Sequence, residues 1–116
     1  MSASPSFIEE ITDLHAEVCS ALADSTRILI IYSLAEKPRN VGDLAQQLGI
    51  SQPAASRHLK ILRERGMVHA IRQGAYMEYH IADQRLVDAL DLLRDVLRDR
   101  LARRASLAEA DQSPAE

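Results

Sequence analysis

Residues 42–62, GDLAQQLGISQPAASRHLKIL, hold two short helical patterns with almost no chain between them. Asn40, just upstream, can cap the first helix. Gly49 follows it, and glycine often ends a helix in the left-handed conformation. Ser51 can cap the second helix through its hydroxyl, and Pro53 falls in the first turn, where its missing N–H has no cost. The chain must therefore form two helices joined by a tight turn.

Two helices joined in this way form a helix-turn-helix, whose second helix enters the major groove of DNA. Groove entry needs small residues where backbones approach and donors near bases. Lys60 and Arg63 suit phosphates, which position the helix without reading sequence. The residues predicted to bind DNA in this segment are Ser51, Gln52, Ala54, Ser56, Arg57, His58, Lys60 and Arg63. The alternative is an ordinary helical hairpin with a solvated basic face.

A β-hairpin is predicted directly after this unit. MVHAI and YMEYHI change to a strand-like period, and RQGA joins them with Gly74 as the turn residue. Such a hairpin after a helix-turn-helix is a wing, whose tip can straddle a phosphate backbone or enter a minor groove. Arg72 and Gln73 at the tip therefore join the predicted DNA-binding residues. His69 and His80 could approach each other, and we expect them to be surface histidines.

Two further helices are predicted before the helix-turn-helix. The first begins at Ser6, whose spacing to Glu9 fits a capping box, and its apolar residues recur at steps of three and four as far as Leu22. The second begins at residues 24–25 and stops before Pro38, since the residue ahead of a proline disfavours helical angles. Its dense apolar run places it at the centre of the fold.

The last helix is predicted from Asp83 and carries two apolar stripes. Leu86, Leu90, Leu93, Leu97 and Leu101 form one stripe. Ala89, Leu92 and Val96 form the second, on a different face of the helix. One helix that buries two faces in so small a domain needs a second surface, and a partner chain supplies it. The predicted homodimer interface consists of Ile11, Leu14, Val18, Leu86, Leu90, Leu93, Leu97 and Leu101.

The predicted fold is mainly α with a β-hairpin wing, a winged helix-turn-helix of five helices in the order α-α-α-α-β-β-α. Residues 6–105 form the dimerising domain. Residues 1–5 are expected to be a flexible tail, and residues 106–116, rich in Ala, Ser, Asp and Glu, a disordered one. With aromatic residues at only 3% of the chain, the core must be aliphatic.

The charge is unevenly distributed along the chain. The net charge of −3 alone argues against a nucleic-acid binder, and residues 1–24 carry five acids and no Lys or Arg. Residues 51–72, however, carry five basic residues against Glu64 alone, a local charge of +4. Nucleic-acid affinity follows the local field, so this segment favours binding to double-stranded DNA.

Several other classes are excluded by what the sequence lacks. One cysteine, Cys19, rules out an intramolecular disulfide framework and suits a reducing cytoplasm. There is no signal-peptide pattern and no apolar run of membrane-spanning length. We find no catalytic Ser/His/Asp, paired-carboxylate or glycine-rich phosphate-binding motif, so an enzyme is not expected.

The chain resembles the ArsR/SmtB family of bacterial winged-helix repressors. The matching stretches are ALADSTRILIIYSL, VGDLAQQLGISQPAASRHLKILRERGMV and RQGAYMEYHI. The resemblance implies a homodimer built on the first and last helices, bound to an imperfect inverted repeat at a promoter. It also implies an effector that weakens DNA binding and turns transcription on.

The family's two common metal sites are both missing from this sequence. Where many members have a Cys-Val-Cys run, this chain has NVGDLAQQ. The positions matching the family's site on the last helix are Asp83, Arg85, Val96 and Asp99. Arg85 and Val96 cannot bind zinc, because a guanidinium stays protonated and valine has no donor atom. Ala75 also stands where an arginine often follows the turn glycine, which leaves Arg72 as the wing's main charge.

His15 and Cys19 are the remaining candidates for an effector site. They are four residues apart on the first helix, so their side chains can meet. Two such pairs across a dimer could supply two His and two Cys ligands to a metal ion, or Cys19 could be oxidised. In the plainer interpretation, Cys19 is a small buried residue and no cofactor binds.

Two function hypotheses remain open on the sequence alone. The first is a homodimeric, sequence-specific DNA-binding repressor. The second is a winged-helix module that binds another protein, since fold does not fix function. The basic segment and the small residues beside it favour DNA.

Overall fold

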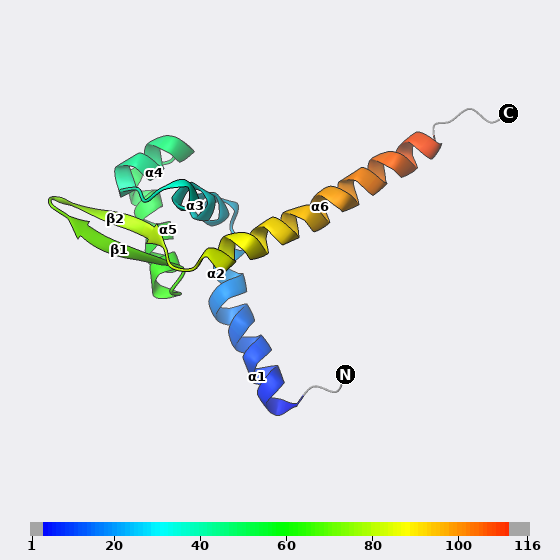
Figure 1. The fold of residues 1–116 in the computed structure, drawn as a ribbon, viewed down its shortest axis with the longest axis horizontal. Helices are drawn as coiled ribbons and strands as arrows, with labels where there is room; N and C mark the ends of the chain where they lie inside the picture. Colours follow the sequence, from blue (N-terminus) through cyan, green and yellow to red (C-terminus); the bar gives the residue numbers. More distant parts are fainter. Residues whose placement is uncertain (1–3, 112–116) are drawn as a thin grey trace. The chain divides into compact units, whose positions relative to one another are not determined.

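The computed structural model describes residues 4–111, and the chain divides after Gln84 into two compact units that we describe separately. The elements, shown in Figure 1, are α1 (Pro5–Asp13), η1 (Leu14–Cys19), α2 (Ser20–Leu22), α3 (Ser25–Glu36), α4 (Val41–Leu48), α5 (Gln52–Glu64), β1 (Val68–Gln73), β2 (Tyr76–Ile81) and α6 (Gln84–Asp111). The first three follow one another without a break. The predicted order of four helices, a hairpin and a last helix is therefore confirmed.

The first helix is capped two residues before the predicted position. The Oγ of Ser4, not that of Ser6, accepts the capping hydrogen bond, from the Phe7 N–H at 3.2 Å. Pro5 then begins α1, because its fixed φ suits the first turn and its missing N–H is not needed there. The prediction of a flexible tail through residue 5 was thus wrong at Pro5, and residues 1–3 of that tail lie outside the described residues.

The middle of this helix is a π-helical turn, which the sequence did not predict. In η1 the backbone N–H of Ser20 bonds to the carbonyl of His15, five residues back rather than four. The Ala16 carbonyl accepts from the Ser20 hydroxyl at 2.5 Å. Single π turns of this kind often occur at functional sites.

The core is built around α3, as its apolar run predicted. Ile30 and Ile31 of α3 are fully buried, as are Leu44 of α4 and Leu59 and Leu62 of α5. The buried hydrophobic residues of the described chain are all aliphatic, which agrees with the low aromatic content. This packing holds α4 and α5 to the central helix and so fixes the helix-turn-helix.

Asp24 caps α3, and its carboxylate should make stability depend on pH. Hydrogen bonds from the Arg27 backbone, with the nearby positive charges of Arg27 and His58, hold the pKa of Asp24 below its usual 3.8. A lowered folded-state pKa means that the stabilisation is present above the unfolded pKa and lost as the pH falls through the folded one.

We therefore expect wild type to be more stable than Asp24→Asn near neutral pH, since Asn caps a helix about equally well but carries no charge. Urea unfolding at a series of pH values should show this difference shrinking only below about pH 4. A difference that stays constant down to pH 3 would contradict the account.

The wing is an antiparallel hairpin with a shorter turn than predicted. β1 extends to Gln73 and pairs with Tyr76, so the predicted four-residue turn is a two-residue turn at Gly74 and Ala75. Gly74 has φ +61° and Ala75 has no positive φ, as in a type II′ turn. The sequence predicted that the first strand ends at residue 71, and this was wrong. Arg72 and Gln73 are polar, but they still pair with β2.

An isolated β-bridge at Arg39 borders β2 on the side away from β1. The Arg39 N–H bonds to the Tyr79 carbonyl at 3.2 Å, and the Tyr79 N–H bonds to the Arg39 carbonyl at 2.8 Å. The Arg39 side chain donates to the Ser33 carbonyl at 3.2 Å and to Glu36 at 2.8 Å. Arg39 thus attaches the wing to the end of α3.

The second unit is α6, which extends beyond the predicted domain end. The helix continues to Asp111, so the predicted disorder from residue 106 was wrong as far as residue 111, where Ala, Leu and Glu favour a helix. Residues 112–116 lie outside the described part. Along α6, Leu93, Leu97 and Leu101 are about half exposed or more, whereas Leu90 is only 5% exposed in the single chain.

No single helix among residues 4–111 is both long and apolar enough to cross a membrane. Only Pro5–Leu22 and Ser25–Glu36 taken together pass that test of length and composition, and they are bent by 82° to each other. The second of them supplies the buried core just described.

Candidate nucleic-acid interface

The turn between α4 and α5 follows the local signals in the sequence. Gly49 adopts the left-handed conformation with φ +67°, and the Ile50 N–H closes the end of α4 by bonding to the Ala45 carbonyl at 3.0 Å. The Ser51 Oγ caps α5 by accepting from the Ala54 N–H at 3.2 Å. Asn40 caps α4 in the same way, through the Asp43 N–H at 2.8 Å. The predicted caps are confirmed.

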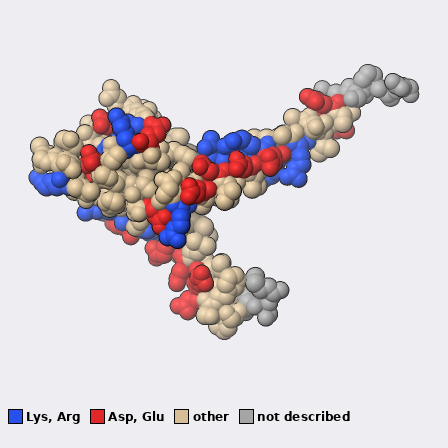
Figure 2. All heavy atoms as spheres, in the orientation of Figure 1, with Lys and Arg blue, Asp and Glu red and all other residues tan. Residues whose placement is uncertain are grey.

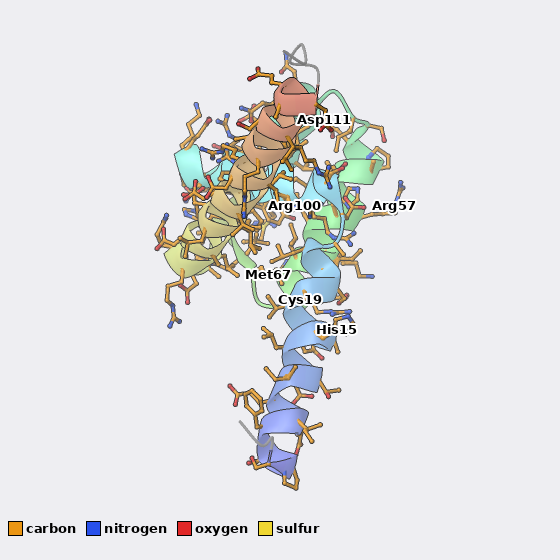
Figure 3. All side chains as sticks on the ribbon, turned by 90° about the vertical axis from the view of Figure 1, so that its right-hand side faces the viewer. His15, Cys19, Arg57, Met67, Arg100 and Asp111 are labelled. Atoms are coloured by element: carbon orange, nitrogen blue, oxygen red, sulfur yellow. The ribbon has the colours of Figure 1, made fainter. Side chains whose placement is uncertain are left out.

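The helix α5 turns one face inward and one outward. Ala55, Leu59 and Leu62 are buried. The outward face contains the exposed residues Ser51, Gln52, Ser56, Arg57, Lys60 and Arg63, with Ala54 half-buried beside them. Arg57 extends away from the helices behind α5 (Figure 3). All but one of the residues predicted to bind DNA from α5 therefore lie on a surface that a duplex can reach or at its edge.

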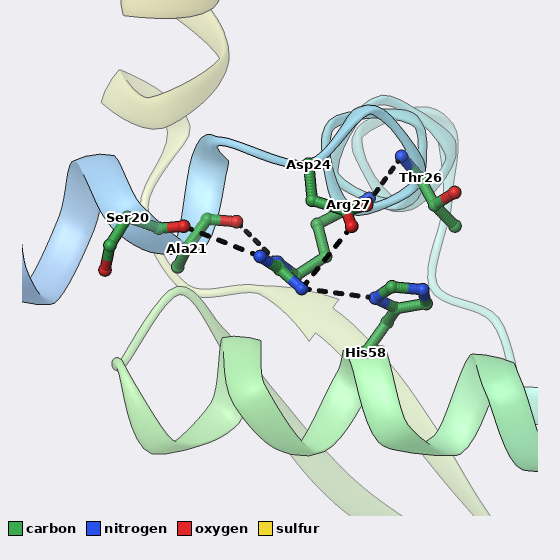
Figure 4. Close-up of polar contacts among 6 residues, drawn as sticks. All are labelled: Ser20, Ala21, Asp24, Thr26, Arg27 and His58. Carbon is green, nitrogen blue, oxygen red and sulfur yellow. Dashed lines mark hydrogen bonds and ion pairs between the residues drawn. The ribbon is translucent and has the colours of Figure 1, made fainter.

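The exception is His58, which is half-buried and turned toward α3. Its Nδ1 lies 3.4 Å from Nη1 of Arg27 (Figure 4). The Nε of Arg27 donates to the Ala21 carbonyl at 2.5 Å, and its Nη2 to the Ser20 carbonyl at 3.5 Å. Its Nη1 also lies 3.8 Å from Asp24 Oδ2. A base contact by His58 stays a prediction. The ring also contacts Arg27 and so links α5 to α3.

Arg65, counted among the basic residues of the segment, is also engaged within the protein. From the end of α5 its Nη1 donates to the carbonyls of Ala16 and Glu17, the latter at 3.3 Å, and to Ser20 Oγ at 3.1 Å. Its Nε lies 3.8 Å from Glu17 Oε2. These acceptors belong to the π turn and its end. Arg27 and Arg65 together therefore fasten α5 to the N-terminal helix.

The remaining charges divide the surface of the first unit. Arg72 and Gln73 on the wing are exposed, and Lys60 lies 4.0 Å from Glu64, a loose pair on the surface. Acidic side chains gather along α1, where no Lys or Arg occurs (Figure 2). The outward face of α5 is thus rich in positive charge and Arg72 adds an exposed cation on the wing, whereas the N-terminal helix carries acidic side chains and no Lys or Arg.

The candidate effector residues both lie on η1. His15 and Cys19 are exposed (Figure 3), so the plainer interpretation of Cys19 as a buried residue is wrong for the single chain. In the described part, no group of three or more His, Cys, Asp or Glu side chains is placed to hold a metal ion. A metal ion or oxidation at His15 and Cys19 remains a prediction.

The turn-linked pair α4–α5 and the following two-stranded wing define a winged helix-turn-helix protein. The model of the arsR family of bacterial regulatory proteins matches residues 24–70. The HTH-type transcriptional repressor SmtB of Mycobacterium tuberculosis is 42% identical over 77 residues, which are 66% of this chain and 57% of that repressor. The chain thus spans somewhat over half the length of that relative.

Solved structures share both the sequence and the fold. The crystal structure of Rv0081 from M. tuberculosis has a TM-score of 0.74 at 34% identity, covering 89% of this chain and 99% of that one. The homodimeric winged helix-turn-helix DNA-binding domain Mb0332 from Mycobacterium bovis, a possible ArsR-family regulator, has a TM-score of 0.73 at 30% identity, covering 87% and 94%. The chain belongs to the arsR family of bacterial regulatory proteins, and the relatives that it resembles are transcriptional regulators.

Proposed function

We propose that this protein is a homodimeric, sequence-specific DNA-binding repressor that acts in the cytoplasm on an inverted-repeat operator. The observation that carries the proposal is the outward face of α5. Its small residues and its exposed basic side chains lie next to one another on a helix that the Gly49 turn and the Ser51 cap hold in place. Arg72 on the wing adds a second exposed positive group.

The dimer is proposed from apolar surface that a monomer leaves in water. Ile11 and Leu14 on the N-terminal helix and Leu93, Leu97 and Leu101 on α6 are all 45% exposed or more. Exposed apolar side chains in such rows mark association surfaces. The homodimeric state of the related Mb0332 domain supports the same conclusion. Leu90, buried in the single chain, is a weaker candidate for this interface than its neighbours.

The salt dependence of binding tests the proposal against the protein-binding alternative. Binding to a duplex from the DNA upstream of this protein's own gene should weaken as salt rises, with a log–log slope of about −0.9 for each phosphate neutralised. A slope near zero, with an equally weak response to every duplex, would favour the module that binds protein.

Arg57→Ala should relax sequence preference as well as weaken binding. We expect a loss of about 1–3 kcal/mol, concentrated at one base position in each half-site, because a bidentate contact with a base edge is removed. Lys60→Ala is the matched control on the same helix, and it should weaken all sequences about equally. If Arg57→Ala also weakens every sequence equally, Arg57 contacts only phosphate.

Arg72→Ala should leave the fold intact and lower affinity for operator and unrelated DNA alike. The wing's exposed guanidinium is expected to contact the phosphate backbone, so the salt slope should fall by about 1. Titration of wild type and Arg72→Ala with operator and unrelated DNA at several salt concentrations measures this change. Unchanged affinity and slope would mean that the wing does not touch DNA.

The predicted effector site has its own test. If Cys19 senses metals or oxidants, Cys19→Ser should abolish operator release by them. Unchanged release in the variant would exclude that role for Cys19.

A further inference from the structure

A pair of histidines on the wing has no part in the proposed DNA contacts. His69 of β1 lies directly opposite His80 of β2 in the hairpin register. Their rings stack with centroids 5.2 Å apart and planes within 6° of parallel, so the approach that the sequence suggested is confirmed. His69 is exposed and His80 half-buried. Two imidazoles therefore face each other where solvent can reach them.

Glu78 orients one of the two rings. Residues two apart on a strand share a face, and the Nε2 of His80 lies 2.9 Å from Oε1 of Glu78. An ionised carboxylate only accepts hydrogen bonds, so Nε2 is the donor in this contact, and in the neutral ring the lone pair that a metal needs is then on Nδ1. A carboxylate that fixes the tautomer of a histidine is the usual support for a metal-binding imidazole.

We propose that His69 and His80 bind a divalent transition-metal ion of the zinc class, one ring nitrogen each. Imidazole nitrogens bind zinc at about 2.0–2.1 Å, so two bound nitrogens lie no more than about 4.2 Å apart. The two ring centroids lie 5.2 Å apart in the stacked arrangement, so binding one ion requires both side chains to rotate until a ring nitrogen of each faces the ion. Since no third side chain of the described residues completes the set, water occupies the remaining positions.

The bound ion links β1 to β2 near the base of the wing. The pair His69–His80 lies one register step from Val68–Ile81 at the open end of the hairpin, while Gln73–Tyr76 closes the other end. The metal thus joins the two strands at a point away from the turn. This inference concerns metal binding by the hairpin and does not depend on the DNA-binding proposal.

The test is a titration of the full chain with Zn²⁺ alone, followed by NMR of the histidine side-chain nitrogens. The chain has four histidines, so each signal can be assigned by substitution. We expect His69 and His80 to shift together with one midpoint. His69→Ala should weaken Zn²⁺ binding at His80 more than tenfold, because losing an orienting partner alone costs about 10–100-fold.

A second pair of variants tests the role of Glu78. Glu78→Gln should weaken Zn²⁺ binding by about tenfold or more, and Glu64→Gln, a change on the surface of α5, should not. Backbone amide spectra establish that each variant is folded. Separate midpoints for His69 and His80, or Zn²⁺ binding that survives His69→Ala, would overturn the proposal.

Discussion

Leu93→Asp is expected to convert the protein into a folded monomer that binds its operator at least about 100-fold more weakly. Leu93 is 63% exposed in the single chain, so the charge should change the free energy of unfolding of one protomer little. In a dimer the same carboxylate would lie in an apolar interface without a partner, which is strongly unfavourable. Loss of the second DNA-binding unit removes an avidity gain of about 10²–10⁴.

Sedimentation equilibrium of wild type and variant measures the first part, and operator titration the second. Ala102→Asp is the matched control, because residue 102 is exposed and lies half a turn around α6 from residue 93. It adds the same charge away from the predicted interface and should leave the dimer intact. A dimeric Leu93→Asp, or a wild type that is already monomeric, would refute this interface.

Arg27→Ala is expected to lower the free energy of unfolding by about 2–3 kcal/mol, the scale of hydrogen bonds made by charged groups. The Arg27 side chain is only 14% exposed and connects the end of α2, the Asp24 cap and His58 of α5. Its removal leaves the Ala21 carbonyl without a donor, and Ala21 is buried. The substitution also removes the contact through Arg27 between α5 and the N-terminal helix, and leaves the contact through Arg65.

Urea unfolding monitored by circular dichroism gives the comparison. Lys60→Ala, which removes a cation that is 77% exposed and loosely paired, should change stability by less than about 0.5 kcal/mol. Arg27→Lys should recover part of the loss, since it restores the charge but not the planar guanidinium. If Arg27→Ala lowers the free energy of unfolding no more than Lys60→Ala does, the contacts of Arg27 with Ala21, Asp24 and His58 do not stabilise the fold.

The sequence predicted the features that depend on nearby residues. The Asn40 and Ser51 caps, the Gly49 turn and the buried face of α5 all rest on residues within a few positions of one another. Helix periodicity likewise indicated which leucines of α6 would lie on one stripe. These signals were enough to predict the helix-turn-helix, the wing and most of the exposed residues on the outward face of α5.

Contacts between distant parts of the chain were not predictable in this way. Arg27 meets His58 across 31 positions, and Arg65 meets Glu17 across 48, so neither contact could be expected from local sequence patterns. The π turn, the bridge at Arg39 and the inward turn of His58 have the same origin, since tertiary packing decides them. The structure of a single chain adds no support for an effector site at His15 and Cys19, because both side chains face solvent there.

The central claim is that two copies of α5 read two half-sites of one operator. Hydroxyl-radical footprinting on the DNA upstream of the protein's own gene tests it most directly, repeated with metals and oxidants. We predict two protected segments about 10–10.5 base pairs apart, or a multiple of that spacing, which Arg57→Ala weakens together. No protection, or a single protected segment unaffected by Arg57→Ala, would contradict the account.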